Sequence, residues 1–321
     1  MFVSIRTWHR VVICCTALLA WLVFPDDLQA AESVLSPLVD QSLLLDCSYV
    51  DGLGVAVGER GHVLRSEDDG QNWEQVKVPT RATLTGVFFL DRNRGWIVGH
   101  DQVILRTVNG GKSWSLIYSA PQQESPLLDV WFADAEHGFA VGAYGRYLET
   151  RDGGVHWRAR LVSEYDYHFN HILVDRQKLF LVGEAGTILR SSDQGGSWEP
   201  ITSPYEGSFF GGLSLGDDNL LIYGLRGHLY RSETGGESWQ PLDSWTESTL
   251  TSGSLLEDGT VLLAGLGGVV LASHDGGKTF VLHMQLDRKG FSALCPADRQ
   301  AVIGVGEFGV KRLTDSGIYP K

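Results

Sequence analysis

The stretch Arg65-Ser66-Glu67-Asp68-Asp69-Gly70-Gln71-Asn72-Trp73 returns along the chain with a nearly fixed period. Its closing aromatic residue recurs at spacings of 41, 43, 41, 41 and 41 residues, as Trp73, Trp114, Trp157, Trp198, Trp239 and Phe280. A second landmark, a glycine that ends a short apolar run, recurs seven times, at Gly58, Gly99, Gly142, Gly183, Gly224, Gly265 and Gly306. A fixed period in this range is typical of repeat architectures. The sequence therefore contains seven units, and the last one stops before its own copy of the motif.

One unit displays the strand pattern of all of them. Residues 84–90, 96–99, 103–107 and 113–117 are short β-rich runs, separated by clusters of Gly, Asn and Asp. Four short strands in a period of about 40 residues are typical of a propeller blade. No window after the N-terminal segment has a convincing helical period. We predict an all-β, seven-bladed β-propeller with four-stranded blades, forming a single domain over residues 31–321 with almost no helix.

Closure of the ring needs a further strand, because the seventh unit ends before its outer one. The apolar segment Val34–Val39 precedes the first unit. We predict that it supplies the missing strand of blade seven and so protects an open sheet edge.

The recurring turn has a physical explanation. The Asp side chain can accept hydrogen bonds from backbone N–H groups of the turn, the glycines permit positive φ, and the Trp covers the hairpin with apolar surface. The motif resembles the Asp-box of bacterial-neuraminidase-repeat proteins. The residues at the Asp position are Asp68, Asn109, Asp152, Asp193 and Asp275, and only Thr234 departs. Since the turn recurs in every complete unit, a structural role is favoured over a metal or sugar site.

The first 30 residues are typical of a secretory signal. Arg6, His9 and Arg10 precede the apolar run Val11–Phe24, and Ala30 offers a cleavage position. The apolar run is about 14 residues long, shorter than the roughly 20 that span a bilayer. We therefore expect an exported protein, periplasmic or associated with the envelope. The net charge of −13 disfavours binding to nucleic acid or to anionic membranes.

Two cysteines remain beyond this segment. Cys47 lies 11 residues before Gly58, and Cys295 lies 11 before Gly306, which places them at equivalent positions of neighbouring inner strands. An even count in an exported protein favours a disulfide. Rotational symmetry argues against it, because equivalent side chains point in the same sense around the ring. Two buried free thiols are the preferred prediction, and the disulfide is the alternative.

Binding is expected at the end of the propeller that carries the second-to-third-strand turns and the blade-to-blade connections, because these loops are irregular. Residues 164–171 and 204–212 combine aromatic and polar groups there. The predicted partner-binding residues are Tyr165, Asp166, His168, Asn170, Tyr205, Glu206, Phe209, Arg60 and Arg226. Such a surface suits a peptide or protein segment. The alternative for Phe169, Phe209 and Phe210 is a place in the core of the inner strands.

Two further patterns have competing interpretations. His168 and His171 with Asp166 could be metal ligands, but residues three apart on a strand point to opposite faces. We therefore expect no metal and no other cofactor. A column of arginines precedes the box Ser or Thr, at Arg65, Arg106, Arg190 and Arg231. These arginines either pair with local carboxylates or form a basic track for an acidic partner.

Residues 95–114 and 138–157 resemble units of the photosystem II stability/assembly factor family. The resemblance implies a seven-bladed propeller that binds a reaction-centre subunit without catalysis, with an arginine patch as the contact. On this basis we expect a monomeric assembly or stability factor that binds a protein or peptide segment of a membrane protein complex. No small-molecule substrate is expected.

Two other functions compete with this one. A sialidase-like glycoside hydrolase also uses Asp-boxes, but it needs an arginine cluster, a Tyr–Glu pair and an acid/base Asp. Its Phe-Arg-Ile-Pro motif is absent from the sequence, and no carboxylate pair stands at matched spacing. The other alternative is a structural accessory subunit of an envelope transport complex.

Overall fold

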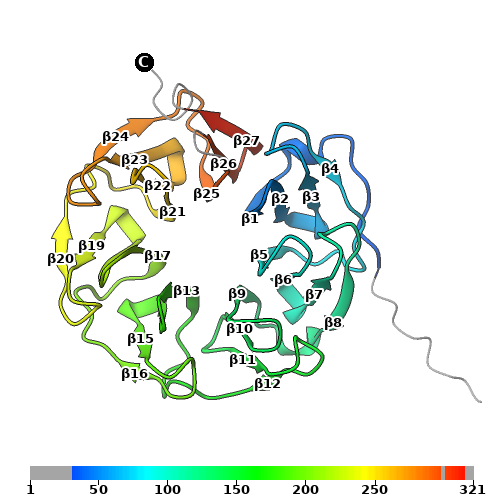
Figure 1. The fold of residues 1–321 in the computed structure, drawn as a ribbon, viewed down its shortest axis with the longest axis horizontal. Helices are drawn as coiled ribbons and strands as arrows, with labels where there is room; N and C mark the ends of the chain where they lie inside the picture. The colour runs from blue at the N-terminus through cyan, green and yellow to red at the C-terminus, as the bar shows by residue number, and fades with distance from the viewer. Residues whose placement is uncertain (1–30, 298–300, 315–321) are drawn as a thin grey trace, which may run out of the picture.

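The computed structural model describes residues 31–297 and 301–314, which form a ring of seven antiparallel sheets (Figure 1). The predicted all-β seven-bladed propeller is confirmed. In the described residues the only helical elements are 3-10 turns, and no helix there is long or apolar enough to cross a membrane. The predicted signal segment lies outside the described residues.

Six blades have four strands in simple up-and-down order, from the centre of the ring outward. Their strands are β1(Leu44–Val50), β2(Leu53–Gly58), β3(Val63–Ser66) and β4(Glu74–Gln75) in blade one; β5(Leu84–Phe89), β6(Gly95–Gly99), β7(Ile104–Thr107) and β8(Ser115–Tyr118) in blade two; β9(Leu127–Phe132), β10(Gly138–Gly142), β11(Tyr147–Thr150) and β12(Arg158–Ala159) in blade three. Blade four has β13(Phe169–Asp175), β14(Lys178–Gly183), β15(Ile188–Ser191) and β16(Glu199–Pro200); blade five has β17(Phe209–Gly216), β18(Asn219–Gly224), β19(Leu229–Ser232) and β20(Gln240–Leu242); blade six has β21(Leu250–Leu255), β22(Val261–Gly265), β23(Val269–Ser273) and β24(Val281–Met284). Blade seven has β25(Phe291–Pro296), β26(Ala301–Gly306) and β27(Gly309–Thr314).

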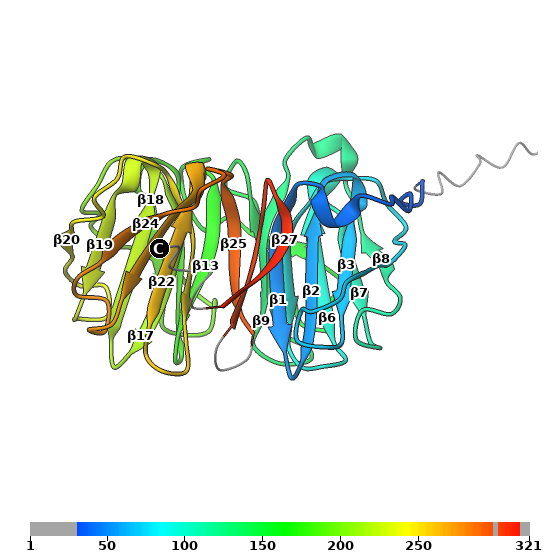
Figure 2. The ribbon, with the colours of Figure 1, turned by 90° about the horizontal axis from the view of Figure 1, so that it is seen from above.

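The hydrophobic core lies between the blades. Each of the seven clusters of buried residues combines side chains from two neighbouring blades. The box aromatics belong to these layers, so that Trp73 packs in the layer between blades seven and one and Trp114 in the layer between blades one and two. Middle strands such as β2 and β6 are buried along their whole length because a blade is covered on both sides. Figure 2 shows this ring from the side.

The box turns have the hydrogen bonds that define their shape. In blade one the Asp68 carboxylate accepts from the Asn72 backbone N–H at 2.9 Å and from the Ser66 hydroxyl at 2.8 Å. In blade five, where Thr234 departs from the motif, its hydroxyl accepts from the Ser238 N–H at 3.0 Å. A hydroxyl therefore replaces the carboxylate as the acceptor of the turn.

The expected closure by an N-terminal strand is wrong for the described residues. The sheet of blade seven has three strands, and residues 34–39 form none. The segment instead lies against blade one, where the Ser33 N–H donates to Val78 O at 2.9 Å, and it ends in the 3-10 turn η1(Val39–Gln41), which contacts β27. Pro37 lacks the N–H that a strand pairing would need.

A disulfide joins Cys47 to Cys295, and their Cα atoms are 6.1 Å apart. The preference for two free thiols is therefore wrong, and the reason lies in strand register. Leu44 pairs with Gly58 and Phe291 with Gly306, so these two residues are equivalent. Cys47 is the third residue after Leu44, whereas Cys295 is the fourth after Phe291. Successive side chains of a strand point to opposite sides, so this one-residue offset turns the two sulfurs toward each other.

Candidate functional site

One end of the propeller, which we call the connector face, carries the turns between the second and third strands together with the blade-to-blade connections. Five of these turns are 3-10 turns, η2(Glu59–Gly61), η3(His100–Gln102), η5(Glu184–Gly186), η6(Leu225–Gly227) and η7(Leu266–Gly268). The opposite end, the box face, carries the Asp-box turns beside the turns between the first and second strands, as the bond from Gly110 N–H to Asn93 O shows.

The turns of the connector face are fixed by the connections that cross them. Gly186 in η5 has φ +71°, and a Cβ built there would lie 2.1 Å from Tyr205 O in the following connection. The Gly186 N–H also donates to Gly207 O at 2.9 Å. Only glycine fits such a close approach. The middle residues of the turns, among them Arg60 and Arg226 at φ 56°, therefore stand on rigid supports.

The connection between blades three and four forms an exposed aromatic ridge. Tyr165 is 64% exposed and stacks on Tyr167 with ring centroids 5.3 Å apart. Tyr144, at the tip of the neighbouring turn, is 61% exposed and meets the His168 ring edge-to-face at 5.0 Å. We call Tyr144, Tyr165, Tyr167 and His168 the aromatic ridge. The carboxylate of Asp166 adds an exposed charge to the same connection.

A cavity of about 650 Å³ lies beside the ridge. Tyr165, Tyr167, Leu161 and Trp198 contribute to its lining, and Leu161 is strongly exposed. Aromatic rings at the edge of an apolar hollow are the usual anchors of a protein or peptide ligand.

The connection between blades four and five differs from the prediction in part. Tyr205 is half-buried, because its ring stacks on His228 at 4.0 Å and contacts the ring of Phe209 at 6.0 Å. Phe209 itself has no exposed surface and belongs to the core between blades four and five. Its inclusion among accessible residues was therefore wrong, and the core alternative holds. Glu206 is exposed.

The remaining predicted residues lie toward the centre of the ring. Asn170 is half-buried, and its side-chain amide donates to Phe209 O of the next blade at 2.7 Å. Phe169 is buried, whereas Phe210, one residue after Phe209, is 37% exposed and lines the central channel. His171 pairs with Asp129 at 2.7 Å, whereas the His168 ring lies 3.9 Å from the Glu184 carboxylate. No group of three metal-ligating side chains occurs in the described residues.

Sequence reasoning did not select Trp245, which is 69% exposed in the connection between blades five and six. It lines a hollow of about 440 Å³ together with Arg226 and His228. Its signal in the sequence is its position: unlike the six box aromatics, this tryptophan stands outside the repeat. The same criterion identifies Tyr144 among the turn residues.

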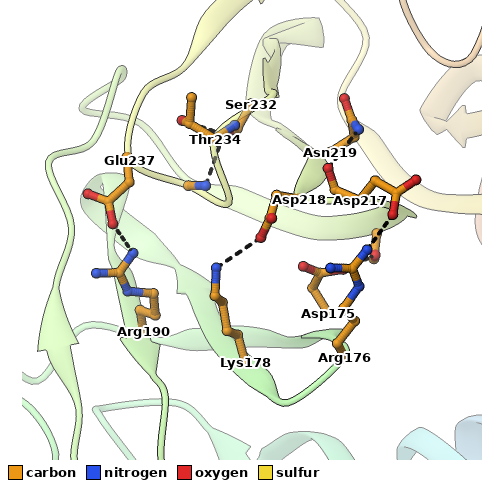
Figure 3. A network of polar contacts seen from close by, with 12 residues as sticks. Asp175, Arg176, Lys178, Arg190, Asp217, Asp218, Asn219, Ser232, Thr234 and Glu237 are labelled. Carbon is orange, nitrogen blue, oxygen red and sulfur yellow. Dashed lines mark hydrogen bonds and ion pairs between the residues drawn. The ribbon is translucent and has the colours of Figure 1, made fainter.

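The arginine column does not form an exposed basic track. Arg65 and Arg231 are buried, and Arg65, Arg106 and Arg190 reach toward the box of the next blade. Arg65 donates to Gly110 O of the next box at 2.5 Å, Arg190 pairs with Glu199 and with Glu237 of the next box, and Arg231 pairs with Glu233. Figure 3 shows the Arg190–Glu237 pair beside Lys178–Asp218 and Arg176–Asp217. Arg106 lies against Gly153 of the following box. The interpretation as pairing with local groups is the one that fits.

Two arginines outside the column make the same kind of contact. Arg160 donates to Gly195 O at 2.8 Å and to Gly196 O at 2.7 Å in the box of blade four. Arg312 in blade seven donates to Asp69 O in the box of blade one at 3.0 Å. Arginine-to-carbonyl bonds therefore link blade one to two, blade three to four and blade seven to one on the box face.

Comparison with known proteins relates the sequence of this propeller to a protein family. A family model described as "Photosynthesis system II assembly factor YCF48" matches residues 65–125 and 118–255, more than half of the chain. The chain is 39% identical over 46 residues to the photosystem II assembly protein Ycf48 of Thermosynechococcus vestitus, a match that covers 14% of this chain and 13% of that protein. It is 34% identical over 89 residues to the chloroplastic stability/assembly factor HCF136 of Cyanidioschyzon merolae, covering 26% of this chain and 20% of that protein.

The fold matches a solved structure over nearly its whole length. A structure titled "YCF48 bound to D1 peptide" superposes with a TM-score of 0.70 at 22% identity, covering 85% of this chain and 91% of that one. At this identity the likeness is one of fold, whereas the family match rests on sequence over more than half of the chain. The chain therefore belongs to the family described as photosynthesis system II assembly factor YCF48.

Proposed function

We propose that this protein is an exported, non-catalytic propeller that binds a segment of a membrane-protein subunit and acts as an assembly or stability factor for that subunit's complex. The observation that carries the proposal is the aromatic ridge with its adjoining cavity on the connector face. Relatives in the family are named as photosystem II assembly factors, and one solved relative is titled as bound to a D1 peptide.

The ridge suits a peptide ligand for a physical reason. Stacking already holds Tyr165 on Tyr167, and the edge-to-face contact already holds Tyr144 against His168. Rings that are ordered before binding lose little conformational entropy when a partner covers them. The exposed carboxylates of Asp166 and Glu206 add polar contacts that select a basic or hydrogen-bonding segment.

Export has two supports of different kinds. The first 30 residues have the composition of a secretory signal. The Cys47–Cys295 bond is the type of cross-link that persists in oxidising compartments such as the periplasm. Both observations favour a role outside the cytosol, on the side of a membrane where the segments of membrane proteins emerge.

The test uses the double variant Tyr144→Ala/Tyr165→Ala. The matched control is Val108→Ala/Val155→Ala, which removes two exposed apolar side chains from the box turns of the opposite face. The purified proteins are cross-linked to envelope membranes of the native organism, the captured subunit is identified by mass spectrometry, and its segments are titrated as synthetic peptides. We expect the ridge variant to bind at least tenfold more weakly, with unchanged melting temperature, and the control to bind normally.

Equal peptide binding by the ridge variant and the native protein would contradict the proposal. Turnover of a fluorogenic sialoside by the native protein would contradict its non-catalytic part. Tyr205 is left intact in this design because it packs on His228 and Phe209, so its removal would confuse lost binding with lost stability.

A further inference from the structure

The central channel contains a cavity of about 440 Å³ that is lined by the inner strands of all seven blades (Figure 1). Two carboxylates line it, from Asp46 on β1 and Asp129 on β9, together with the imidazole of His171 on β13. Among the described residues, no Lys or Arg lines it. The rings of Trp131 and Phe210 also line the cavity, so its wall combines negative charge with aromatic surface.

The two carboxylates differ in how their charge is balanced. Asp129 pairs with the His171 ring at 2.7 Å and accepts from the Ile172 N–H at 2.8 Å. Burial works to lower the pKa of His171, but the charge and hydrogen bond of Asp129 outweigh it and hold that pKa above its usual value. Asp46 accepts a backbone N–H from Val87 at 2.7 Å, and no ion pair to it occurs in the described part of the chain.

Asp46 is therefore a half-buried carboxylate on the cavity wall without a cationic partner in contact. Burial raises its pKa to about 7, and repulsion from Asp129 acts in the same direction. An uncompensated buried charge is costly, and a bound cation would remove that cost. Asp46 and Asp129 occupy the same register position in blades one and three. The equivalent residue of blade two, which lies between them, is Gly86 and has no side chain. A cation in the cavity would therefore meet both carboxylates on its wall.

A tyrosine reaches the same cavity by a departure from the repeat. The residue before the landmark glycine is valine in five of the seven units, but it is Tyr223 in blade five. Tyr223 lines the cavity from β18, a middle strand, because the inner-strand residues beside it are glycines. A Cβ built at Gly211 would lie 2.6 Å from its hydroxyl oxygen, and one at Gly253 would lie 3.0 Å from it.

The Tyr223 hydroxyl lacks a partner. The residue is 2% exposed, and its hydroxyl makes no hydrogen bond within residues 31–297 and 301–314. The hydroxyl is therefore available as an acceptor in the cavity that Asp46 and Asp129 also line.

We propose that the channel binds a primary ammonium group on a slender aliphatic chain, with Asp46, Asp129 and the Tyr223 hydroxyl as its acceptors. An ammonium is compact and has three donors, which matches three oxygen acceptors contributed by three separate blades. The rings of Trp131 and Phe210 favour an organic cation and its chain. Such a group comes either from a free alkylamine or from a lysine side chain of a peptide that enters the channel.

The site implies a pH dependence. The titratable groups that act on Asp46 are Asp129 and His171. Tyr223 interacts with Asp129. The ammonium favours the ionised form of Asp46, while an alkylamine keeps its proton well above pH 8. With a pKa of about 7 for Asp46, ionisation rises about tenfold between pH 6 and pH 8. We expect affinity to rise by about that factor.

Calorimetric titration of the full protein with n-butylammonium tests the site, with n-butanol as the neutral probe of equal size. Asp46→Asn and Asp129→Asn are expected to bind at least tenfold more weakly, and Tyr223→Phe about threefold more weakly. Glu136→Gln, which removes one exposed carboxylate on the box face, is expected to bind normally. Melting curves establish that each variant is folded.

Two arms identify the source of the ammonium group. A capped pentapeptide with one central lysine is compared with the same peptide carrying acetyl-lysine. Binding of the lysine peptide alone assigns a peptide source, and binding of butylammonium without the peptide assigns a free amine. The inference is overturned if butylammonium binds no better than butanol, or if Asp46→Asn binds it as the native protein does. The ridge variant tests the connector face separately, so each failure is distinguishable.

Discussion

The seam between blades seven and one is where the ring is expected to open first, and the Cys47–Cys295 bond holds it. The bond closes a loop of 248 residues in sequence separation. Cross-linking a loop of that length removes chain entropy worth about 5 kcal/mol from the unfolded state. Blade seven has three strands in the described residues, so this seam lacks the outer strand that the other six blades have. The variant Cys47→Ala/Cys295→Ala should therefore lose roughly 5 kcal/mol of unfolding free energy.

Guanidinium unfolding measures this loss. The native protein is unfolded with and without a strong reductant, and the double variant is unfolded under the same two conditions. The reduced native protein and the variant should agree, and reductant should leave the variant unchanged. If all four curves coincide within about 1 kcal/mol, packing and the Arg312–Asp69 bond hold the seam without the disulfide, and the reasoning is refuted.

Three further predictions concern the charged groups. Arg65→Ala should lower the free energy of unfolding by about 2–3 kcal/mol, because it removes a buried charged donor between blades. Arg176→Ala, which removes one partner of an exposed ion pair, should lower it by less than about 0.5 kcal/mol. Urea unfolding measures both changes. Hydrogen bonds from the turn lower the pKa of three box aspartates, Asp68, Asp152 and Asp193, to about 2. The stability that these carboxylates contribute is therefore complete above pH 4 and is lost as pH falls from about 4 to 2. A melting temperature that stays constant over that range would contradict this prediction. Folding raises the pKa of Asp46 to about 7, so its ionisation costs stability increasingly from pH 4 to 7; Asp46→Asn should raise the melting temperature at pH 8 and leave it unchanged at pH 4.

The repeat made the fold predictable, because its two landmarks recur where chemistry requires them. The Asp-box needs its acceptor and its glycines in every blade, and a glycine must end each second strand because the first strand's backbone crosses it. At Gly58, for example, a built Cβ would lie 2.2 Å from Leu43 O. Counting residues back from the landmark glycine could not show that the first hairpin of blade one is one residue shorter than that of blade seven. Blade one is one residue shorter between Leu44 and Gly58 than blade seven between its equivalents, and that difference reversed the direction of Cys47.

The candidate site was predictable only in outline. The sequence identified the irregular connections, but neighbouring aromatics there have opposite environments. Phe209 is buried, while Phe210 next to it lines the channel, because successive strand residues alternate between faces. Tyr165 and Tyr205 are equally polar, and the ring contacts of Tyr205 with His228 and Phe209 make it the half-buried one of the two. Such differences depend on which turn each connection crosses, and composition does not encode that.

The box face holds neighbouring blades together and the connector face carries exposed aromatic side chains, so the binding proposal rests on the aromatic side chains. The family resemblance implied an arginine patch as the contact with a partner. Here Arg190 and Arg231 are engaged by carboxylates, and Arg65, Arg160 and Arg312 donate to carbonyls of the next blade. A partner that recruited Arg65, Arg190, Arg160 or Arg312 would have to break bonds between neighbouring blades. A ligand on the connector face meets aromatic side chains that are already ordered and do not bond neighbouring blades together. It can therefore bind there without weakening the propeller.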